Sequence, residues 1–413
     1  MTIEVMNAIK KDKQIKKFSA YGFLKNLKFF EPYLVLFLLG NGLNFFQIGI
    51  LYAIRESITY IFEVPSGFIA DYFGRKKELY LCFSFYIISF VFFFMIGPFW
   101  IAVIAMSFFG LGEAFRSGTH KAMIYTYLEE KDWQGHKAFV YGRTRSFSLI
   151  GSAISSVLAI VLILNVPSSR YIFLASILPY ILDLFLIMSY PESLNGERIH
   201  VEGHVLKVMK DHLIGILKQP KLRIILFSSA SFEAVFKSIK DYIQPILEMM
   251  IVSSGLVLIS TMTPDENLKV ILGMSYGIIY VISASAARRA YLLKKIMSST
   301  ALLNTFYVLL ALCMISLFFI IRLDYYLLII ILYLVLYLLR DMRKPIFVEV
   351  CDDYMEKHQR ATVLSVESQL RALFTVILAP VIGSIADQFG VSYVMLSIGI
   401  ILLISFVFLK IKE

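Results

Sequence analysis

Apolar runs of about 20 residues recur along almost the whole chain, and this feature restricts the fold most. A helix of this length and composition crosses the hydrocarbon core of a membrane. Hydrophobic residues make up 58% of the sequence and charged residues only 17%, which excludes an ordinary soluble protein. We count about twelve candidate spans, near 22–40, 43–69, 79–97, 99–126, 138–163, 170–190, 222–251, 268–287, 296–321, 325–348, 361–384 and 391–409. The sequence therefore predicts an all-α membrane protein.

The Lys and Arg residues set the expected orientation in the membrane. The segment 1–28 is rich in lysine, three cations follow the second span at 75–77, and four more follow the eighth within 288–295. The connections at 40–44 and 97–100 carry no charge. Cytoplasmic loops hold the surplus cations of membrane proteins, so we expect a cytoplasmic-membrane protein with both termini in the cytoplasm. The same rule explains the net charge of +10 without a nucleic-acid partner.

A polar segment at 191–221 interrupts the series of spans. Apolar residues between Val205 and Leu217 recur at helical spacing with cations opposite, which predicts an amphipathic helix on the inner membrane surface. We expect a six-helix bundle at 1–190, a cytoplasmic linker at 191–221 and a second six-helix bundle at 222–413. Two similar halves related by a pseudo-two-fold axis are typical of transporters with internal repeats, which carry a small-molecule solute.

Ionisable residues are unevenly distributed among the spans. The third, ninth and twelfth spans have none in their apolar runs, whereas the first, fourth, seventh and tenth each have at least one. A charge in hydrocarbon costs at least ~2.5 kcal/mol, so it persists where the side chain meets water or a partner. We expect the first helix of each three-helix unit to line a wet cavity and the third to face lipid. The candidate residues for proton or solute binding in that cavity are Glu31, Arg55, Glu56, Glu113, Arg116, Glu233, Lys237, Asp241, Glu367 and Arg371.

The spacing of these residues predicts some of their contacts. Glu233, Lys237 and Asp241 are four residues apart and should share one helical face, either as a self-neutralising ladder or as a cavity wall whose acids exchange protons. Glu113 and Arg116 are three residues apart and should pair. Arg55 and Glu56, being adjacent, are expected to point to different sides of their helix.

Two further placements depend on where the helices begin and end. Glu31 is followed by Pro32, so this acid lies either at a kink inside the first span or at the membrane interface where a helix begins. Arg340 and Asp341 come near the end of the tenth predicted span, where long side chains are expected to reach the aqueous interface.

The stretch GFIADYFGRKK at 67–77 joins the second and third spans. It resembles the signature loop of the major facilitator superfamily, and the number of spans and the central linker agree with that family over nearly the whole length. The resemblance implies a latch made by Gly67, Asp71, Gly74 and Arg75 that holds one conformation of a transporter. Physically, Gly67 would allow close packing, Asp71 would cap a neighbouring helix N-terminus and Gly74 would supply a turn.

A near copy of this stretch, GSIADQFGV at 383–391, lacks the cations and is expected on the outer side. It leaves open that the loop at 67–77 is only a topology anchor. The surrounding sequence at 360–390 is similar to the eleventh span of bacterial proteins often labelled as drug efflux proteins. The loop after the eighth span has no acid, so a symmetric second latch is not expected.

These features predict a proton-coupled secondary transporter that exports a small solute by alternating access and works as a monomer among membrane lipids. Proton-coupled uptake and a transporter-like sensor that moves nothing are the alternatives. An enzyme is not expected, because the sequence has no phosphate-binding glycine loop, HExxH motif or nucleophile elbow. No cofactor and no metal are predicted, and three cysteines do not make a disulfide framework.

Overall fold

The computed structural model describes residues 3–195, 219–254, 259–355 and 360–412. These residues are helical almost throughout, and no strand occurs among them. Eight of the described helices are long and apolar enough to cross a membrane. The prediction of an all-α membrane protein is therefore confirmed, while the amphipathic helix expected at 205–217 lies outside the described residues.

The chain forms two compact units. Unit 1 comprises Met1–Phe37, Ser57–His200 and Lys269–Val281, and unit 2 comprises Leu38–Glu56, Val201–Leu268 and Ile282–Glu413. Two continuous helices, α4 and α13, contribute residues to both units. The division into 1–190, 191–221 and 222–413 stays a prediction.

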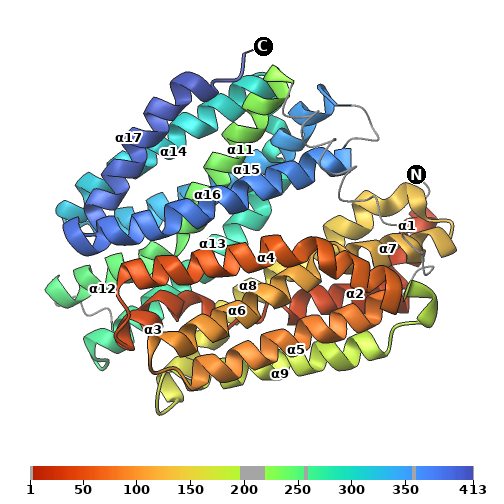
Figure 1. Ribbon diagram of the computed structural model, residues 1–413, viewed down its shortest axis with the longest axis horizontal. Helices are drawn as coiled ribbons and strands as arrows, with labels where there is room; N and C mark the ends of the chain where they lie inside the picture. Colours follow the sequence, from red (N-terminus) through yellow and green to blue (C-terminus); the bar gives the residue numbers. More distant parts are fainter. Residues whose placement is uncertain (1–2, 196–218, 255–258, 356–359, 413) are drawn as a thin grey trace. The chain divides into compact units, whose positions relative to one another are not determined.

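Unit 1 is built mainly from α2, α5, α6, α8 and α9, with α5 packed on α6 and α9, and α2 packed on α8 and α9 (Figure 1). Its helical segments are α1 (Ile3–Lys11), α2 (Lys13–Leu24), η1 (Glu31–Tyr33), α5 (Arg75–Phe94), α6 (Phe99–Arg116), α7 (Thr119–Glu130), η2 (Gln134–His136), α8 (Lys137–Asn165), α9 (Tyr171–Met188), η3 (Glu192–Asn195) and parts of α3, α4 and α13.

Aromatic side chains fill the core of unit 1. Tyr86 of α5 packs edge-on against Phe109 of α6 and Tyr180 of α9, with ring centroids 5.1 and 5.2 Å apart. A Cβ added to Gly112 of α6 would lie 2.9 Å from the Tyr86 ring, so this glycine allows the two helices to approach. Aromatic side chains from the predicted spans thus make contacts between the helices of unit 1.

Unit 2 is built mainly from α11, α14, α15, α16 and α17, with α14 packed on α15 and α17, and α11 packed on α16 (Figure 1). Its helical segments are α4 (Phe45–Phe73) in its first part, α11 (Pro220–Ile239), η4 (Lys240–Tyr242), α12 (Ile243–Ser254), α13 (Pro264–Arg289) at both ends, η5 (Ala290–Lys295), α14 (Ser299–Arg322), α15 (Tyr326–Asp352), α16 (Arg360–Phe389) and α17 (Val391–Leu409).

The first predicted span is interrupted, so the expectation of one span at 22–40 is corrected. Its helix α2 begins earlier, at Lys13, and ends at Leu24. A non-helical stretch follows, and then η1, with Pro32 in its first turn, leads into α3 (Leu34–Gly40). Pro32 therefore begins a helical segment, but that segment lies within a longer first span rather than at its outer edge.

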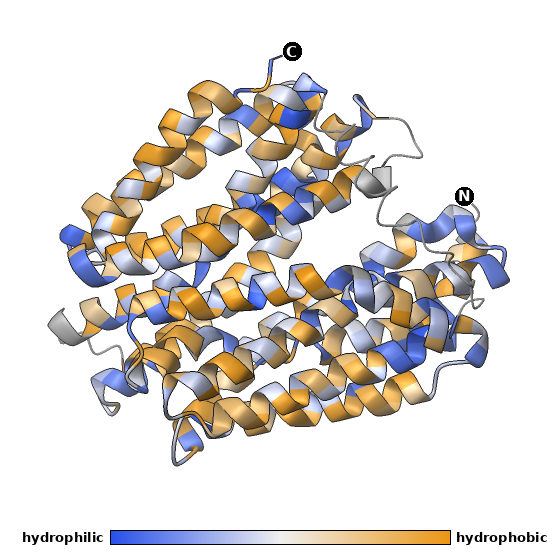
Figure 2. Cartoon of the chain, in the orientation of Figure 1, coloured by the Kyte–Doolittle hydropathy of each residue, from blue (hydrophilic) through white to orange (hydrophobic). Residues whose placement is uncertain are grey.

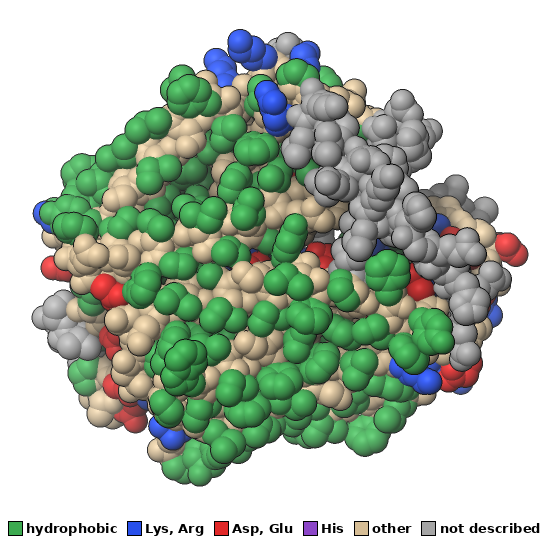
Figure 3. Space-filling model, in the orientation of Figure 1, with side chains coloured by type: hydrophobic (Ala, Val, Ile, Leu, Met, Phe, Trp, Pro, Cys, Tyr) green, Lys and Arg blue, Asp and Glu red, His purple; other side chains and the backbone are tan. Residues whose placement is uncertain are grey.

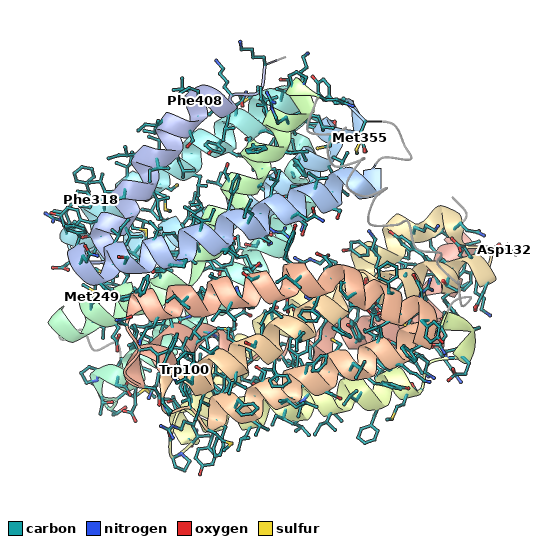
Figure 4. All side chains as sticks on the ribbon, viewed as in Figure 1. Trp100, Asp132, Met249, Phe318, Met355 and Phe408 are labelled. Atoms are coloured by element: carbon teal, nitrogen blue, oxygen red, sulfur yellow. The ribbon has the colours of Figure 1, made fainter. Side chains whose placement is uncertain are left out.

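Large apolar side chains cover the outer faces of both units. In Figure 2, α5 and α17 are hydrophobic over most of their length, whereas hydrophilic residues interrupt α15. Figure 3 shows hydrophobic side chains over most of the visible surface of each unit. Phe408 of α17 and Trp100 of α6, both labelled in Figure 4, are 75% and 72% exposed. Such a surface suits lipid and agrees with the expectation for the third and twelfth spans.

Candidate functional site

A charged network in unit 2 includes most of the acids and cations that the sequence singles out. Glu56 of α4 is 4% exposed, and its two carboxylate oxygens accept from Lys237 Nζ at 2.6 Å and Arg55 Nε at 3.1 Å. The guanidinium of Arg55 also lies over the ring of Tyr52, 4.8 Å from its centroid. Arg55 and Glu56 therefore meet, and the expectation that adjacent residues point apart is wrong, because both side chains are long enough to bend back.

The acids of α11 do not form a ladder with Lys237. Glu233 pairs with Arg340 of α15 at 3.3 Å, while Lys237 pairs with Glu56 of α4. The α-helix ends at Ile239, so Asp241 lies in the 3-10 turn η4 and leaves the shared face. There it accepts from Lys240 at 2.8 Å and from the hydroxyl of Tyr52 at 3.2 Å.

Helix α15 supplies two arginines to this network, the partly exposed Arg340 and the buried Arg343. Arg340 bridges Glu233 and Asp341, the latter at 2.8 Å. Arg343 is 1% exposed and donates to the hydroxyls of Ser229 and Ser228 on α11. The sequence analysis did not select Arg343, although it follows Arg340 by one helical turn, and that spacing was the available signal.

Helix α16 completes the network with Glu367 and Arg371, which are one turn apart and 3.8 Å from each other. Ser229 of α11 donates to Glu367 at 3.3 Å and accepts from Arg343. The unit 2 charge network is defined below as Arg55, Glu56, Glu233, Lys237, Lys240, Asp241, Arg340, Asp341, Arg343, Glu367 and Arg371.

Two charges of this network, Arg55 and Arg371, lie far from the ends of their helices. Arg55 is ten residues from the start of α4, about 15 Å along its axis, and Arg371 is 11 residues from the start of α16, about 16 Å. Half of a hydrocarbon core of ~30 Å is also about 15 Å. Helix α15 continues to Asp352, well past Arg340, and Arg340 pairs with Glu233 of α11. The expectation that Arg340 and Asp341 reach the aqueous interface stays a prediction.

A second group of charges lies in unit 1, around Glu113 of α6. One oxygen of Glu113 accepts from the hydroxyl of Tyr86 at 2.6 Å, and the other pairs with Arg116 at 3.1 Å. The predicted pairing of Glu113 with Arg116 is therefore confirmed. Lys28 lies 3.9 Å from Glu113, and its ammonium is 5.4 Å from the ring centroid of Phe109.

The sequence places Lys25 and Lys28 in the lysine-rich segment expected in the cytoplasm, and that orientation stays a prediction. In the structure both lie in the non-helical stretch between α2 and η1, and Lys28 contacts Glu113 of α6. Glu31 belongs to η1, three residues after Lys28. We call Lys25, Lys28 and Arg116 the unit 1 cation cluster. The break after Leu24, which brings these lysines beside α6, has no clear sequence signal other than Pro32.

The loop at 67–77 keeps only part of its predicted geometry. Gly74 has φ +98°, so it supplies the expected turn and caps α5. Gly67 has open space around it, so the expected close packing is not seen. Arg75 donates to Thr126 of α7 at 2.7 Å, and within the described ranges Asp71 has no recorded hydrogen bond. The latch role of Gly67, Asp71, Gly74 and Arg75 stays a prediction.

Lys76, in the same loop, is bound at the end of unit 1. Its ammonium donates to the carbonyl of Tyr190 at 3.0 Å and to the carboxylate of Glu192, and its backbone N–H donates to Asn195 at 2.9 Å. The hydrogen bond and charge of Lys76 lower the pKa of Glu192. This cation is therefore a structural link between α5 and η3 as well as a topology signal.

The near copy of the loop binds another helix. Asp387, close to the end of α16, accepts from the backbone N–H groups of Phe45 and Phe46 at 2.9 and 2.8 Å. These are the first residues of α4, so Asp387 caps its N-terminus. Close packing accompanies the cap, because added Cβ atoms at Gly49 and Gly383 would overlap the backbone at Ala379 and Phe45.

The described residues contain no group of three or more His, Cys, Asp or Glu side chains that could hold a metal ion. The network instead consists of ion pairs between helices, with hydroxyl groups at its edges. Such an arrangement can exchange one partner for another, or for a solute or a proton, when helices move.

Sequence comparison decides the family. The sequence matches the Major Facilitator Superfamily over residues 26–374. The chain belongs to this family. It is therefore a multi-pass membrane protein of a transporter family and not of an enzyme family.

A curated relative is the uncharacterized MFS-type transporter YxaM of Bacillus subtilis (strain 168), which is 28% identical over 225 residues. That alignment covers 53% of this chain and 54% of YxaM, so the chain matches about half the length of this relative.

Solved transporter structures share the fold. The nucleoside transporter NupG has a TM-score of 0.74 at 10% identity, over 97% of this chain and 100% of NupG. A POT family transporter in complex with 5-aminolevulinic acid has a TM-score of 0.70 at 14% identity, over 97% and 95% of the two chains. A D-xylose-proton symporter has a TM-score of 0.69 at 14% identity, over 97% of each chain. At these identities the similarity shows the fold alone.

Proposed function

We propose that the protein is a proton-coupled secondary transporter of the cytoplasmic membrane, which moves its solute by alternating access. It works as a monomer with both termini in the cytoplasm. The observation that carries the proposal is the pairing of buried acids with cations of other helices, Glu56 with Lys237 and Glu233 with Arg340. A cation favours the ionised acid, so separating a pair prepares the carboxylate to take a proton.

Alternating access requires such exchangeable partners. The pairs join α4 to α11 and α11 to α15, so helix movement that carries the solute past the site also breaks or forms them. The D-xylose-proton symporter has the same fold, which supports the compatibility of this architecture with proton coupling. Glu233 is our first candidate for the proton carrier, followed by Glu56 and Glu31.

Export is the proposed direction, on the similarity of the segment 360–390 to the eleventh span of efflux proteins. Uptake is the alternative, and the ion pairs described above suit either direction, because proton exchange at a carboxylate is reversible.

The test is transport by the full-length protein in sealed proteoliposomes, across a panel of radiolabelled solutes, with an imposed proton gradient. We expect accumulation of at least one solute that stops when a protonophore collapses the gradient. Accumulation that is unaffected by the protonophore would contradict proton coupling. The direction of transport follows from whether solute and protons move the same way or opposite ways across the vesicle membrane.

A further inference from the structure

The unit 1 cation cluster brings three cations close to a single paired carboxylate. Lys25, Lys28 and Arg116 surround one closely paired carboxylate, that of Glu113. Arg145 of α8 adds a further charge that acts on Lys25.

Two other acids can be added to this count. Glu31 follows Lys28 by three residues, and the buried Asp183 of α9 interacts electrostatically with Lys25. With both counted as anions, three acids face the three cations of the cluster, and the fourth cation, Arg145, is exposed. Glu113 is the acid that pairs with both Lys28 and Arg116.

Arg116 is the last residue of α6, but the cluster contacts aromatic residues nearer the middle of α5 and α6. Phe109, over which Lys28 lies, is ten residues from the start of α6, about 15 Å along the axis. Tyr86, which binds Glu113 and Arg116, is 11 residues from the start of α5, about 16 Å. Both distances are about half of the ~30 Å hydrocarbon core, where charge is costly.

The cations are also partly accessible. The side chains of Lys28 and Arg116 are 22% and 30% exposed. Exposure of an ammonium or guanidinium to hydrocarbon costs at least ~2.5 kcal/mol, so these parts face water or a solute rather than lipid.

Lys28 has donor capacity left for a ligand. An ammonium has three N–H donors, and its recorded acceptor within the described ranges, Glu113, is 3.9 Å away. Both oxygens of Glu113 already have closer donors, Tyr86 at 2.6 Å and Arg116 at 3.1 Å. The Lys28 ammonium lies beside the ring of Phe109 and can donate to an acceptor closer than Glu113.

We propose that the unit 1 cation cluster binds an anionic group of the transported solute, a carboxylate or a phosphate. Lys28 and Arg116 donate to its oxygens, and the apolar faces of Phe109 and Tyr86 border it. This inference rests on the proposed function as a transporter and names the chemical class of its solute. The solute anion supplies the close acceptor that Lys28 lacks, since Glu113 is 3.9 Å away.

The experiment measures binding by thermal shift on the full chain, purified in a neutral detergent without anionic lipid. The probes are matched pairs of compounds: glucose 6-phosphate with glucose, uridine 5′-monophosphate with uridine, and succinate with 1,4-butanediol. We expect an anionic member to stabilise the protein while its neutral partner does not. Stabilisation only after addition of anionic lipid would assign the cluster to a lipid headgroup and overturn the proposal.

Variants assign the binding to the cluster. Lys28→Gln should weaken binding of the stabilising anion at least tenfold, a change of about 1.4 kcal/mol. Lys77→Gln removes one charge from an exposed position of the same unit and should leave binding unchanged. Lys28→Arg keeps the charge and should retain the preference for the anion, which provides a test if Lys28→Gln does not fold.

The proposal is overturned if no anion in the panel binds, if neutral partners bind equally well, or if Lys28→Gln and Lys77→Gln have the same effect. Anion binding without any transport would refute the proposed function and would leave the cluster as an anion site without a transported solute. Transport of neutral solutes without anion binding would support the proposed function and refute this inference.

Discussion

Replacement of Glu56 tests whether the ion pairs between helices hold unit 2 together. The side chain of Glu56 is 5% exposed and binds two cations, Lys237 and Arg55, so Glu56→Gln removes a buried charge that both cations contact. Breaking one side of a buried pair costs about 3–5 kcal/mol. Because the Lys237 side chain is 32% exposed and can be hydrated, we expect a cost of about 2–3 kcal/mol.

The second variant removes the opposite charge. Lys237→Met leaves Glu56 with Arg55 as its remaining partner, so its cost should be smaller, about 1–2 kcal/mol. The double variant Glu56→Gln with Lys237→Met removes both charges of the ion pair, so neither partner is left with an unbalanced charge. We therefore expect the double variant to lose less stability than the sum of the single variants, with a coupling of about 1–2 kcal/mol.

The assay is thermal unfolding of the purified full chain in detergent. For a unit of this size each kcal/mol corresponds to roughly 2–4 °C, so Glu56→Gln should lower Tm by roughly 4–12 °C. The control is Glu129→Gln, which breaks an exposed pair with Lys137 whose side chains are 56% and 37% exposed. Such a pair contributes about 0–1 kcal/mol. Equal effects of Glu56→Gln and Glu129→Gln, or strict additivity in the cycle, would refute the reasoning.

Four further substitutions test the predicted functions of single residues. Asp71→Asn and Arg75→Ala should slow transport without reducing the amount of folded protein in the membrane, and unchanged initial rates in both would leave the loop as a topology anchor. Glu233→Gln should keep solute binding and counterflow but lose accumulation driven by the proton gradient, because glutamine does not titrate. Normal accumulation by this variant at every pH would mean that another residue carries the proton. Asp387→Asn should lower Tm by roughly 2–4 °C, since it weakens an N-cap worth about 1 kcal/mol. The control Gln388→Ala, at the adjacent exposed position, should leave Tm unchanged, and equal Tm values for the two variants would contradict the cap.

The membrane fold was predictable because hydropathy acts locally along the chain. Each of the predicted spans overlaps a helix or a pair of helical segments in the structure. The first span was placed wrongly at its start because α2 contains three lysines, which a local average treats as a cytoplasmic loop. The sequence analysis counted Lys28 with the cytoplasmic lysines, because its contacts with Glu113 and Phe109 are tertiary and leave no local signal.

The ion pairs divide in a similar way. Glu113 with Arg116, and Glu367 with Arg371, lie one turn apart on a single helix, so their spacing is sufficient to predict the contact. Glu56 with Lys237 joins residues 181 positions apart, and no single-sequence pattern connects them. The sequence identified these as candidate residues through the cost of charge in hydrocarbon, but the partners required the tertiary structure.

The two similar stretches at 67–74 and 383–390 show where local sequence stops determining structure. Gly74 and Gly390, the last residues of each, have φ values of +98° and +90°, and each caps the following helix. The turn is therefore the same in both. The first glycines differ, because Gly67 has open space around it while Gly383 lies against the backbone at Phe45.

This difference makes a prediction from a matched pair of variants. Gly67→Ala adds a methyl group in open space inside α4 and should stabilise the protein by up to about 1 kcal/mol, because alanine favours a helix. Gly383→Ala makes the same chemical change but forces α16 away from the start of α4, which also weakens the cap made by Asp387. Its cost should exceed about 1 kcal/mol, and thermal unfolding of both variants measures the difference. Similar Tm values would mean that α4 and α16 do not approach as closely as the glycines indicate, and the assignment of Asp387 as the cap of α4 would fail with it.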